Sequence, residues 1–102
     1  MVANVTIGNG VTSIRYEAFY GCISLTSITI PDSVTEIGNS AFEHCISLTE
    51  VYCKATTPPW GNYYMFYDTA ISKIYVPIES VRAYKSAEGW RDYAGAIVGY
   101  DF

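Results

Sequence analysis

The chain has 102 residues, half of them hydrophobic, and a formal net charge of −4 at pH 7. This length allows one domain at most, and the hydrophobic fraction is sufficient for a core. Nucleic acid is not expected as a partner, because phosphate contacts require a basic surface. Membrane insertion is not expected either, because the sequence has no run of about 18 apolar residues. The order of basic, apolar and small residues that marks a signal peptide is also missing from it.

An internal repeat organises the first half of the chain. When residues 5–27 are laid over residues 28–50, twelve of the 23 positions are identical. These positions are Thr6/Thr29, Ile7/Ile30, Val11/Val34, Thr12/Thr35, Ile14/Ile37, Ala18/Ala41, Phe19/Phe42, Cys22/Cys45, Ile23/Ile46, Ser24/Ser47, Leu25/Leu48 and Thr26/Thr49. A period of roughly 20 to 29 residues with apolar positions in register is typical of a repeat solenoid built from stacked coils.

Each coil begins with a short alternating segment, which predicts a β-strand. Such segments occur at one spacing in residues 5–7, 28–30, 51–53 and 74–76. The first and third side chains of each segment then face the core, and the middle one faces outward. Stacked in parallel about 4.8 Å apart, the strands would form a ladder. Its outer face would carry Thr6, Thr29, Tyr52 and Tyr75.

Turn residues and a second apolar pair predict the rest of each coil. Glycine, proline, asparagine and aspartate at residues 8–10 and 31–33 favour turns, and an apolar pair follows each turn. A short helical or 3₁₀ turn would then place Phe19 and Phe42 under the strand layer. The spacing predicts that the period continues without insertion. Met65 would then follow Phe42, and Trp60 would follow Ile37.

The pattern changes after Pro77. Residues 79–85 and 90–94 read as short helices with apolar residues at i,i+3, and residues 97–98 read as a closing strand. Terminal repeats must be covered, because an open coil exposes apolar side chains and unpaired strand edges. We therefore predict one domain over residues 1–102. Its parts are coils at 5–27, 28–50 and 51–73, the start of the last rung at 74–76, and a C-terminal helical cap at 77–102.

No comparable cap precedes the first strand. Either the chain is the C-terminal fragment of a longer solenoid, or its first coil pairs with another molecule. The uncapped N-terminal coil is expected to favour self-association at high concentration. A strictly monomeric mass by light scattering at millimolar protein would count against this expectation.

Two stretches of the second coil, IPDSVTEIG at residues 30–38 and SAFEHCISL at residues 40–48, carry a family resemblance. They follow the pattern I-P-x-S-V-T-x-I-G-x-x-A-F-x-x-C-x-x-L, so residues 5–76 resemble the BspA-like leucine-rich repeats of bacterial surface proteins. The first coil departs at Gly8 and Arg15, and the third departs more, at residues 56–60. The resemblance implies a leucine-rich-repeat-like α/β solenoid. It also implies an extracellular or surface-attached protein that adheres to host proteins, other cells or glycans.

The cysteines and the single histidine could in principle react or bind a metal, but a structural role explains each of them. Cys22 and Cys45 lie one coil apart, which is compatible with a disulfide or with two buried free thiols in an apolar ladder. The ladder is the preferred interpretation, and Cys53 falls in the core series. His44 falls at a turn facing water, and the chain has no CxxC, so no metal or cofactor is expected. No nucleophile elbow or phosphate-binding glycine loop is present, so an enzyme is not expected.

The outward ladder is the best candidate binding surface. Tyrosine is enriched at interfaces because it buries area and still forms a hydrogen bond, although strand propensity alone also explains tyrosine there. The candidate residues are Ser27, Thr29, Glu50, Tyr52, Lys54, Lys73 and Tyr75. An alternative aromatic platform for sugar rings consists of Trp60, Tyr63, Tyr64 and Tyr67, although cap packing is the preferred interpretation of this cluster.

These observations lead to three functional hypotheses. The first is a non-enzymatic adhesion module that binds a protein partner or a host extracellular-matrix component. The second is a structural terminal cap of a longer surface stalk, and the third is a carbohydrate-binding module. Resemblance at the level of fold does not choose among them.

Overall fold

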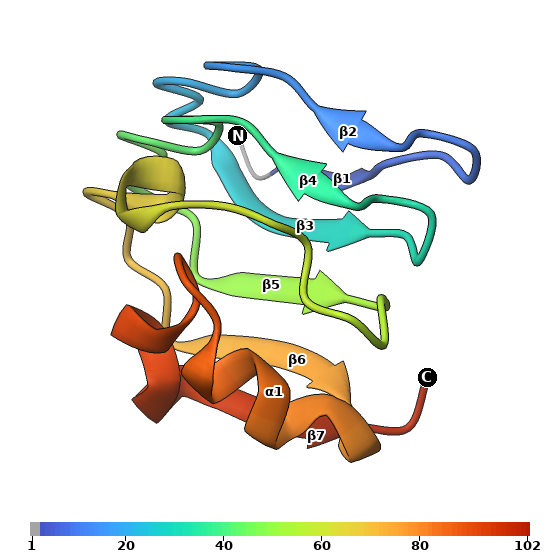
Figure 1. The fold of residues 1–102 in the computed structure, drawn as a ribbon. Coiled ribbons are helices and arrows are strands. Elements are labelled where there is room, and N and C mark those ends of the chain that lie inside the picture. The colour runs from blue at the N-terminus through green and yellow to red at the C-terminus, as the bar shows by residue number, and fades with distance from the viewer. Residues whose placement is uncertain (1–2) are drawn as a thin grey trace.

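The computed structural model describes residues 3–102, so residues 1 and 2 of the segment before the first strand lie outside the described residues. Five parallel strands form one ladder in the order β1-β3-β5-β6-β7, and two very short strands form a second ladder (Figure 1). The first ladder consists of β1 (Ala3–Thr6), β3 (Leu25–Ile30), β5 (Glu50–Cys53), β6 (Lys73–Pro77) and β7 (Ile97–Tyr100). The second consists of β2 (Ser13–Ile14) and β4 (Glu36–Ile37).

The register of the long ladder follows the period of the sequence. Val5 pairs with Ile28, Ile28 with Val51, and Val51 with Ile74, which confirms the four predicted strands. Ile74 in turn pairs with Ile97, again one full period later. The predicted closing strand is therefore a full fifth rung, and β6 is not the last rung of the ladder.

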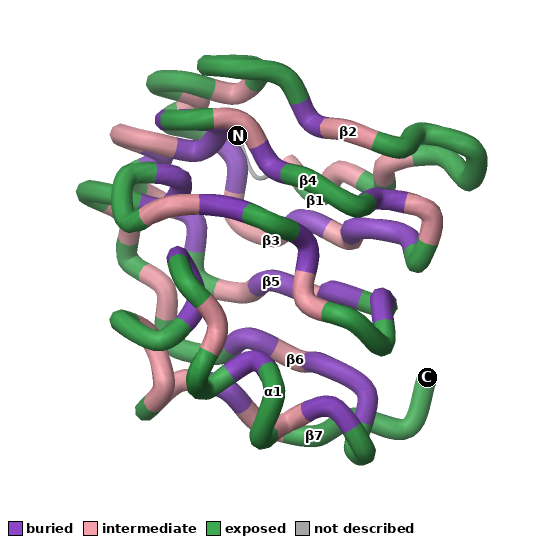
Figure 2. Tube along the Cα trace, in the orientation of Figure 1, coloured by how far each residue is buried: buried purple, intermediate pink, exposed green. Residues whose placement is uncertain are grey.

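The core lies inside the coils, under the long ladder. Ile28 and Ile30 of β3, Val51 and Cys53 of β5, and Ile74 and Val76 of β6 have no exposed surface, and Figure 2 shows buried positions alternating along these strands with partly exposed ones. Hydroxyl groups bind the coils together at their edge. Each donates to a backbone carbonyl of the preceding coil: Thr26 to Ala3 at 3.3 Å, Thr49 to Thr26 at 3.3 Å, and Ser72 to Thr49 at 3.2 Å.

The segments that carry Phe19 and Phe42 are successive hydrogen-bonded turns, not regular helix. Glu17 and Ser40 have left-handed φ values of 55° and 60°, which interrupt helical geometry before each phenylalanine. The Phe19 and Phe42 rings stack with their centroids 5.2 Å apart and their planes 4° from parallel. This stack confirms the predicted position of the phenylalanine series.

The third coil contains a one-residue insertion, so the prediction of an uninterrupted period is wrong there. Trp60 bridges Glu36 and not Ile37, the residue one period before it, and Phe66 stacks on Phe42 with ring centroids 5.4 Å apart. Phe66 therefore continues the phenylalanine stack in place of Met65, although both side chains are fully buried. The regular period returns by Lys73, which pairs with Glu50.

The cap consists of the 3₁₀ helix η2 (Ile78–Ser80), the helix α1 (Val81–Ser86), the 3₁₀ helix η3 (Arg91–Ala96) and β7. The helix α1 packs on β6 and β7 (Figure 1). Two short helices were predicted here, and the second is a 3₁₀ helix that begins after Trp90. Tyr84 and Trp90 are both fully buried, with ring centroids 4.9 Å apart in an edge-to-face contact.

The cap also holds the turn of the third coil. Tyr84 Oη donates to the carbonyl of Ala55 at 2.6 Å, Ser80 Oγ to that of Thr56 at 2.7 Å, and Trp90 Nε1 to that of Pro59 at 2.9 Å. These bonds hold the turn to the cap and satisfy the carbonyls of the buried residues Ala55 and Pro59. The insertion is thus stabilised by side chains that follow it by roughly one coil.

Candidate functional site

The outer face of the long ladder presents two stacked tyrosines. Tyr52 of β5 and Tyr75 of β6 are paired in register, and their rings lie 4.6 Å apart at an angle of 13°. Parallel strands in register place equivalent side chains directly above each other at about the strand spacing, which explains the stack. Both side chains are half-buried, and Thr29 of β3 pairs with Tyr52 on the side away from Tyr75. The structure therefore places Thr29, Tyr52 and Tyr75 together, as predicted.

Polar residues flank the tyrosines on both sides. Ser27, Glu50 and Lys73 form one row across β3, β5 and β6, and Lys54 follows β5. Ser27 Oγ donates to Asn4 Oδ1 at 2.7 Å, and Tyr52 Oη donates to Glu50 Oε1 at 3.4 Å.

Glu50 and Lys73 are paired in the ladder, but their side chains do not form a salt bridge with each other. Within residues 3–102, the only contacts at salt-bridge distance are those of His44 with carboxylates, so neither Glu50 nor Lys73 is in a salt bridge. Partial burial, and then the Glu50 carboxylate, raise the pKa of Tyr52. The face therefore presents neutral hydroxyl groups between separate charges.

Tyr100 and Phe102 extend this patch, and sequence reasoning missed both. Tyr100 lies edge-on to Tyr75 and Tyr52, with centroid distances of 5.5 and 6.1 Å, and Phe102 contacts Tyr100 at 4.8 Å. Tyr100 pairs with Pro77, one period earlier in the chain. Extending the repeat period past Pro77 would have found Tyr100, but no repeat signal marks Phe102.

The alternative aromatic platform divides into two parts. Tyr63, Tyr64 and Tyr67 are exposed and contact one another at centroid distances of 5.2 to 5.6 Å. Among the described residues Trp60 forms no ring contact with them, and it is 64 % exposed, because its backbone pairs with Glu36. The predicted place of Trp60 in the buried Ile37 series was therefore wrong, and so was the interpretation of its ring as cap packing. The one-residue insertion turns the indole outward.

The cysteines are free thiols in this structure. Cys45 Sγ donates to the carbonyl of Phe19 at 3.0 Å, and burial raises the pKa of both Cys45 and Cys53 to about 11. A thiol that is neutral at physiological pH is a poor nucleophile and a poor metal ligand. Cys45 and Cys53 are therefore buried thiols, as predicted, whereas Cys22, the other predicted member of the thiol ladder, is only partly buried because it lies in the first coil.

His44 lies at the predicted turn, with a left-handed φ of 63°, but it does not simply face water. Its Nδ1 lies 2.6 Å from Asp68 Oδ2, and its Nε2 lies 3.4 Å from Glu43 Oε2. The imidazole is half-buried and links the second and third coils. Within residues 3–102, no group of three His, Cys, Asp or Glu side chains is close enough to hold a metal ion.

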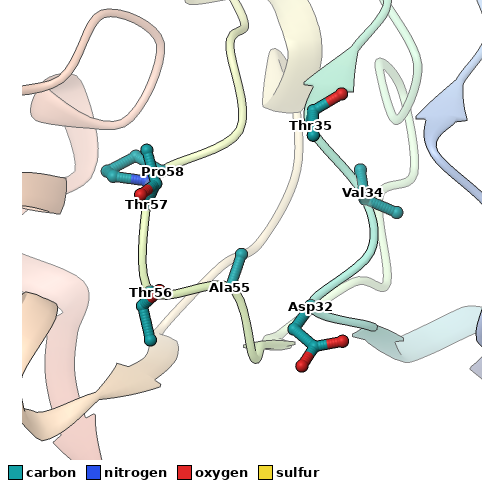
Figure 3. A pocket seen from close by; sticks show the side chains of 7 residues that line it. All are labelled: Asp32, Val34, Thr35, Ala55, Thr56, Thr57 and Pro58. Atoms are coloured by element: carbon teal, nitrogen blue, oxygen red, sulfur yellow. The ribbon is translucent and has the colours of Figure 1, made fainter.

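A hollow of about 350 Å³ lies between the turns of the second and third coils. Figure 3 shows Thr56, Thr57 and Pro58 on one chain segment and Asp32, Val34 and Thr35 on the other, with Ala55 beside them. Backbone bonds between the coils are present before the hollow, from Lys54 N to Ile30 O at 3.0 Å, and after it, from Trp60 N to Thr35 O at 2.8 Å. In the described chain, no backbone bond joins residues 31–34 to residues 55–59.

Comparison with known proteins identifies the repeat. Residues 1–87 match the model of the BspA type leucine rich repeat region, described as six copies. No curated protein matches the chain. None of the helices within residues 3–102 has the length and apolar character that a membrane crossing requires. The chain therefore belongs to the BspA-type leucine-rich repeat family, whose members are typically non-enzymatic and whose repeats are generally surface-associated and adhesive.

Proposed function

We propose that this chain is an extracellular, surface-attached adhesion module that binds a protein partner through the outer face of its long ladder. The supporting observation is the stacked pair Tyr52 and Tyr75, extended by Tyr100 and flanked by unpaired charges. The contact residues of the proposal are Ser27, Thr29, Glu50, Tyr52, Lys54, Lys73 and Tyr75, together with Tyr100.

The geometry of the tyrosine pair favours a protein over a glycan on this face. Each of the two stacked rings covers one face of the other, and Tyr100 lies edge-on against both. A sugar ring that stacks on an aromatic residue needs an open ring face, whereas a protein interface uses packed tyrosines with accessible hydroxyl groups. The stack also fixes both side chains before binding, which lowers the entropic cost of association.

The test is binding of the domain to a panel of extracellular-matrix proteins, with Tyr52→Ala/Tyr75→Ala and Tyr52→Thr/Tyr75→Thr beside it. Threonine occupies the equivalent position at Thr29, so the second variant keeps the strand propensity of the row. Loss of two interface tyrosines is expected to weaken binding by about 30-fold or more, equivalent to about 2 kcal/mol. Unchanged binding in both folded variants would remove this face from consideration.

A carbohydrate-binding site at Trp60 is the second candidate. The exposed indole supports it, because an indole with an open face and a backbone fixed in a strand bridge suits sugar stacking. A glycan array with Trp60→Ala as control separates this candidate from the first. If the domain bound neither a protein of the panel nor a glycan of the array, the result would instead favour a structural terminal cap of a longer surface stalk.

A further inference from the structure

The hollow between the second and third turns has one wall that the cap holds by hydrogen bonds. Its outer wall, residues 55–59, is held by the three hydrogen bonds from Tyr84, Ser80 and Trp90 of the cap. The corresponding turns of the first two coils are closed on each other, because Ser33 Oγ accepts from Gly10 N at 3.2 Å and donates to Val11 O at 2.8 Å. The opening is therefore specific to the third coil.

The hollow continues toward the tyrosine patch. A second hollow of about 410 Å³ shares Asp32 and Thr56 with the first and reaches Tyr100 and Phe102. The two hollows adjoin at Asp32 and Thr56, with Thr35 in the lining of the first and Tyr100 in the lining of the second. We call the two adjoining hollows the turn groove.

The turn groove is acidic, and its charges are unpaired. Asp32, Glu79 and Asp101 line it against the single ammonium group of Lys54, so its net charge is −2. In the described part of the chain no salt bridge involves any of these four residues. The carboxylates do not gather into a metal-binding group within residues 3–102. They are distributed along the groove.

We infer that the turn groove binds an extended segment of the protein partner that carries several lysine or arginine residues. Spaced carboxylates complement spaced positive charges on a chain, and the exposed rings of Tyr100 and Phe102, at 45 % and 46 % exposure, supply cation–π partners. The inference rests on the proposed function, because the groove opens onto the tyrosine patch and extends the same interface. It defines the partner by chemistry: a basic, unfolded or extended segment next to the contact with Tyr52 and Tyr75.

The test uses three labelled ten-residue peptides in which alanine alternates with lysine, glutamate or glutamine. Fluorescence anisotropy at 0.1 and 1 M salt measures affinity, and amide chemical shifts locate the site. The lysine peptide is expected to bind, to shift the amides of Asp32, Thr56 and Tyr100, and to weaken in 1 M salt, where the screening length falls from about 10 to about 3 Å. The glutamate peptide is expected not to bind.

Matched variants separate the groove from the overall negative charge. Asp32→Asn/Asp101→Asn should weaken binding of the lysine peptide by about threefold or more, whereas Glu88→Gln/Asp92→Asn should leave it unchanged. Both pairs remove two negative charges, but Glu88 and Asp92 are exposed cap residues outside the groove. The inference would be overturned if both pairs of substitutions weakened binding of the lysine peptide equally. It would also be overturned if cellohexaose bound in the groove and the lysine peptide did not bind.

The proposal for the turn groove and the proposal for the tyrosine face can be refuted independently of each other. With a partner from the matrix panel, loss of binding in Tyr52→Thr/Tyr75→Thr but not in Asp32→Asn/Asp101→Asn would refute the groove and leave the proposed function standing. The reverse pattern would refute the tyrosine face and support the groove.

Discussion

The hydrogen bond between Tyr84 and the third turn offers a direct test of how the insertion is held. Tyr84→Phe removes only the hydroxyl group of a fully buried side chain. That hydroxyl lies 2.6 Å from the carbonyl oxygen of Ala55 and 3.3 Å from Cys53 Sγ, and Ala55 itself is 4 % exposed. The variant therefore leaves a buried carbonyl without a partner, which costs about 1–3 kcal/mol.

This cost is large relative to the whole stability of such a domain, typically about 5–15 kcal/mol. We expect the melting temperature to fall by roughly 4–8 °C for each kcal/mol lost, and urea unfolding followed by circular dichroism gives the free energy directly. Tyr93→Phe is the matched control. Its hydroxyl donates to the carbonyl of Phe66 at 2.9 Å, but the residue is half-buried, so water can replace the lost donor and the cost should stay below about 1 kcal/mol.

A Tyr84→Phe variant that is folded and within about 0.5 kcal/mol of the wild type would refute the reasoning, because surface-like changes fall in that range. A loss equal to that of Tyr93→Phe would do the same. A larger loss, together with changed amide resonances for residues 55–58, would establish that the cap sets the shape of the third turn and of the turn groove.

Three further predictions concern the core. Phe42→Ala should cost about 3–5 kcal/mol in urea unfolding, and Phe19→Ala less, because Phe42 stacks on both sides while Phe19 is partly exposed. Gly38→Ala should lower the melting temperature strongly, since its Cβ would collide with the backbone nitrogen of Tyr16 in the first coil; Gly8→Ala, with open space around it, should not. Burial raises the pKa of the Cys53 thiol from its ordinary value of 9.0 to about 11, so the folded state favours the protonated thiol. The resulting contribution to the free energy of unfolding, about 3 kcal/mol, is fully present below pH 9.0 and is lost as the pH rises through about 11. Cys53→Val should flatten that alkaline loss in urea titrations; an unchanged profile would contradict it.

The sequence by itself determined the ladder and the side chains on its outer face. Ile28 and Ile30 recur as Val51 and Cys53 and as Ile74 and Val76 at one spacing, so a single stacking register buries all of them. Alternation then requires Thr29, Tyr52 and Tyr75 to point outward. Local periodicity carries this information for the long ladder, because β5 and β6 pair with their neighbours in the register of the period.

Only the tertiary structure decided the path of the third coil. The sequence held a partial signal, since Pro58 and Pro59 have no N–H to donate to the second coil. The turn is held by Tyr84 and Trp90 of the cap, which donate to Ala55 and Pro59 across 29 and 31 residues of chain. The outward turn of Trp60 and the groove beside Asp32 follow from the one-residue insertion. Hydrogen bonds between residues so far apart are set by how the cap packs, and no repeat period encodes them.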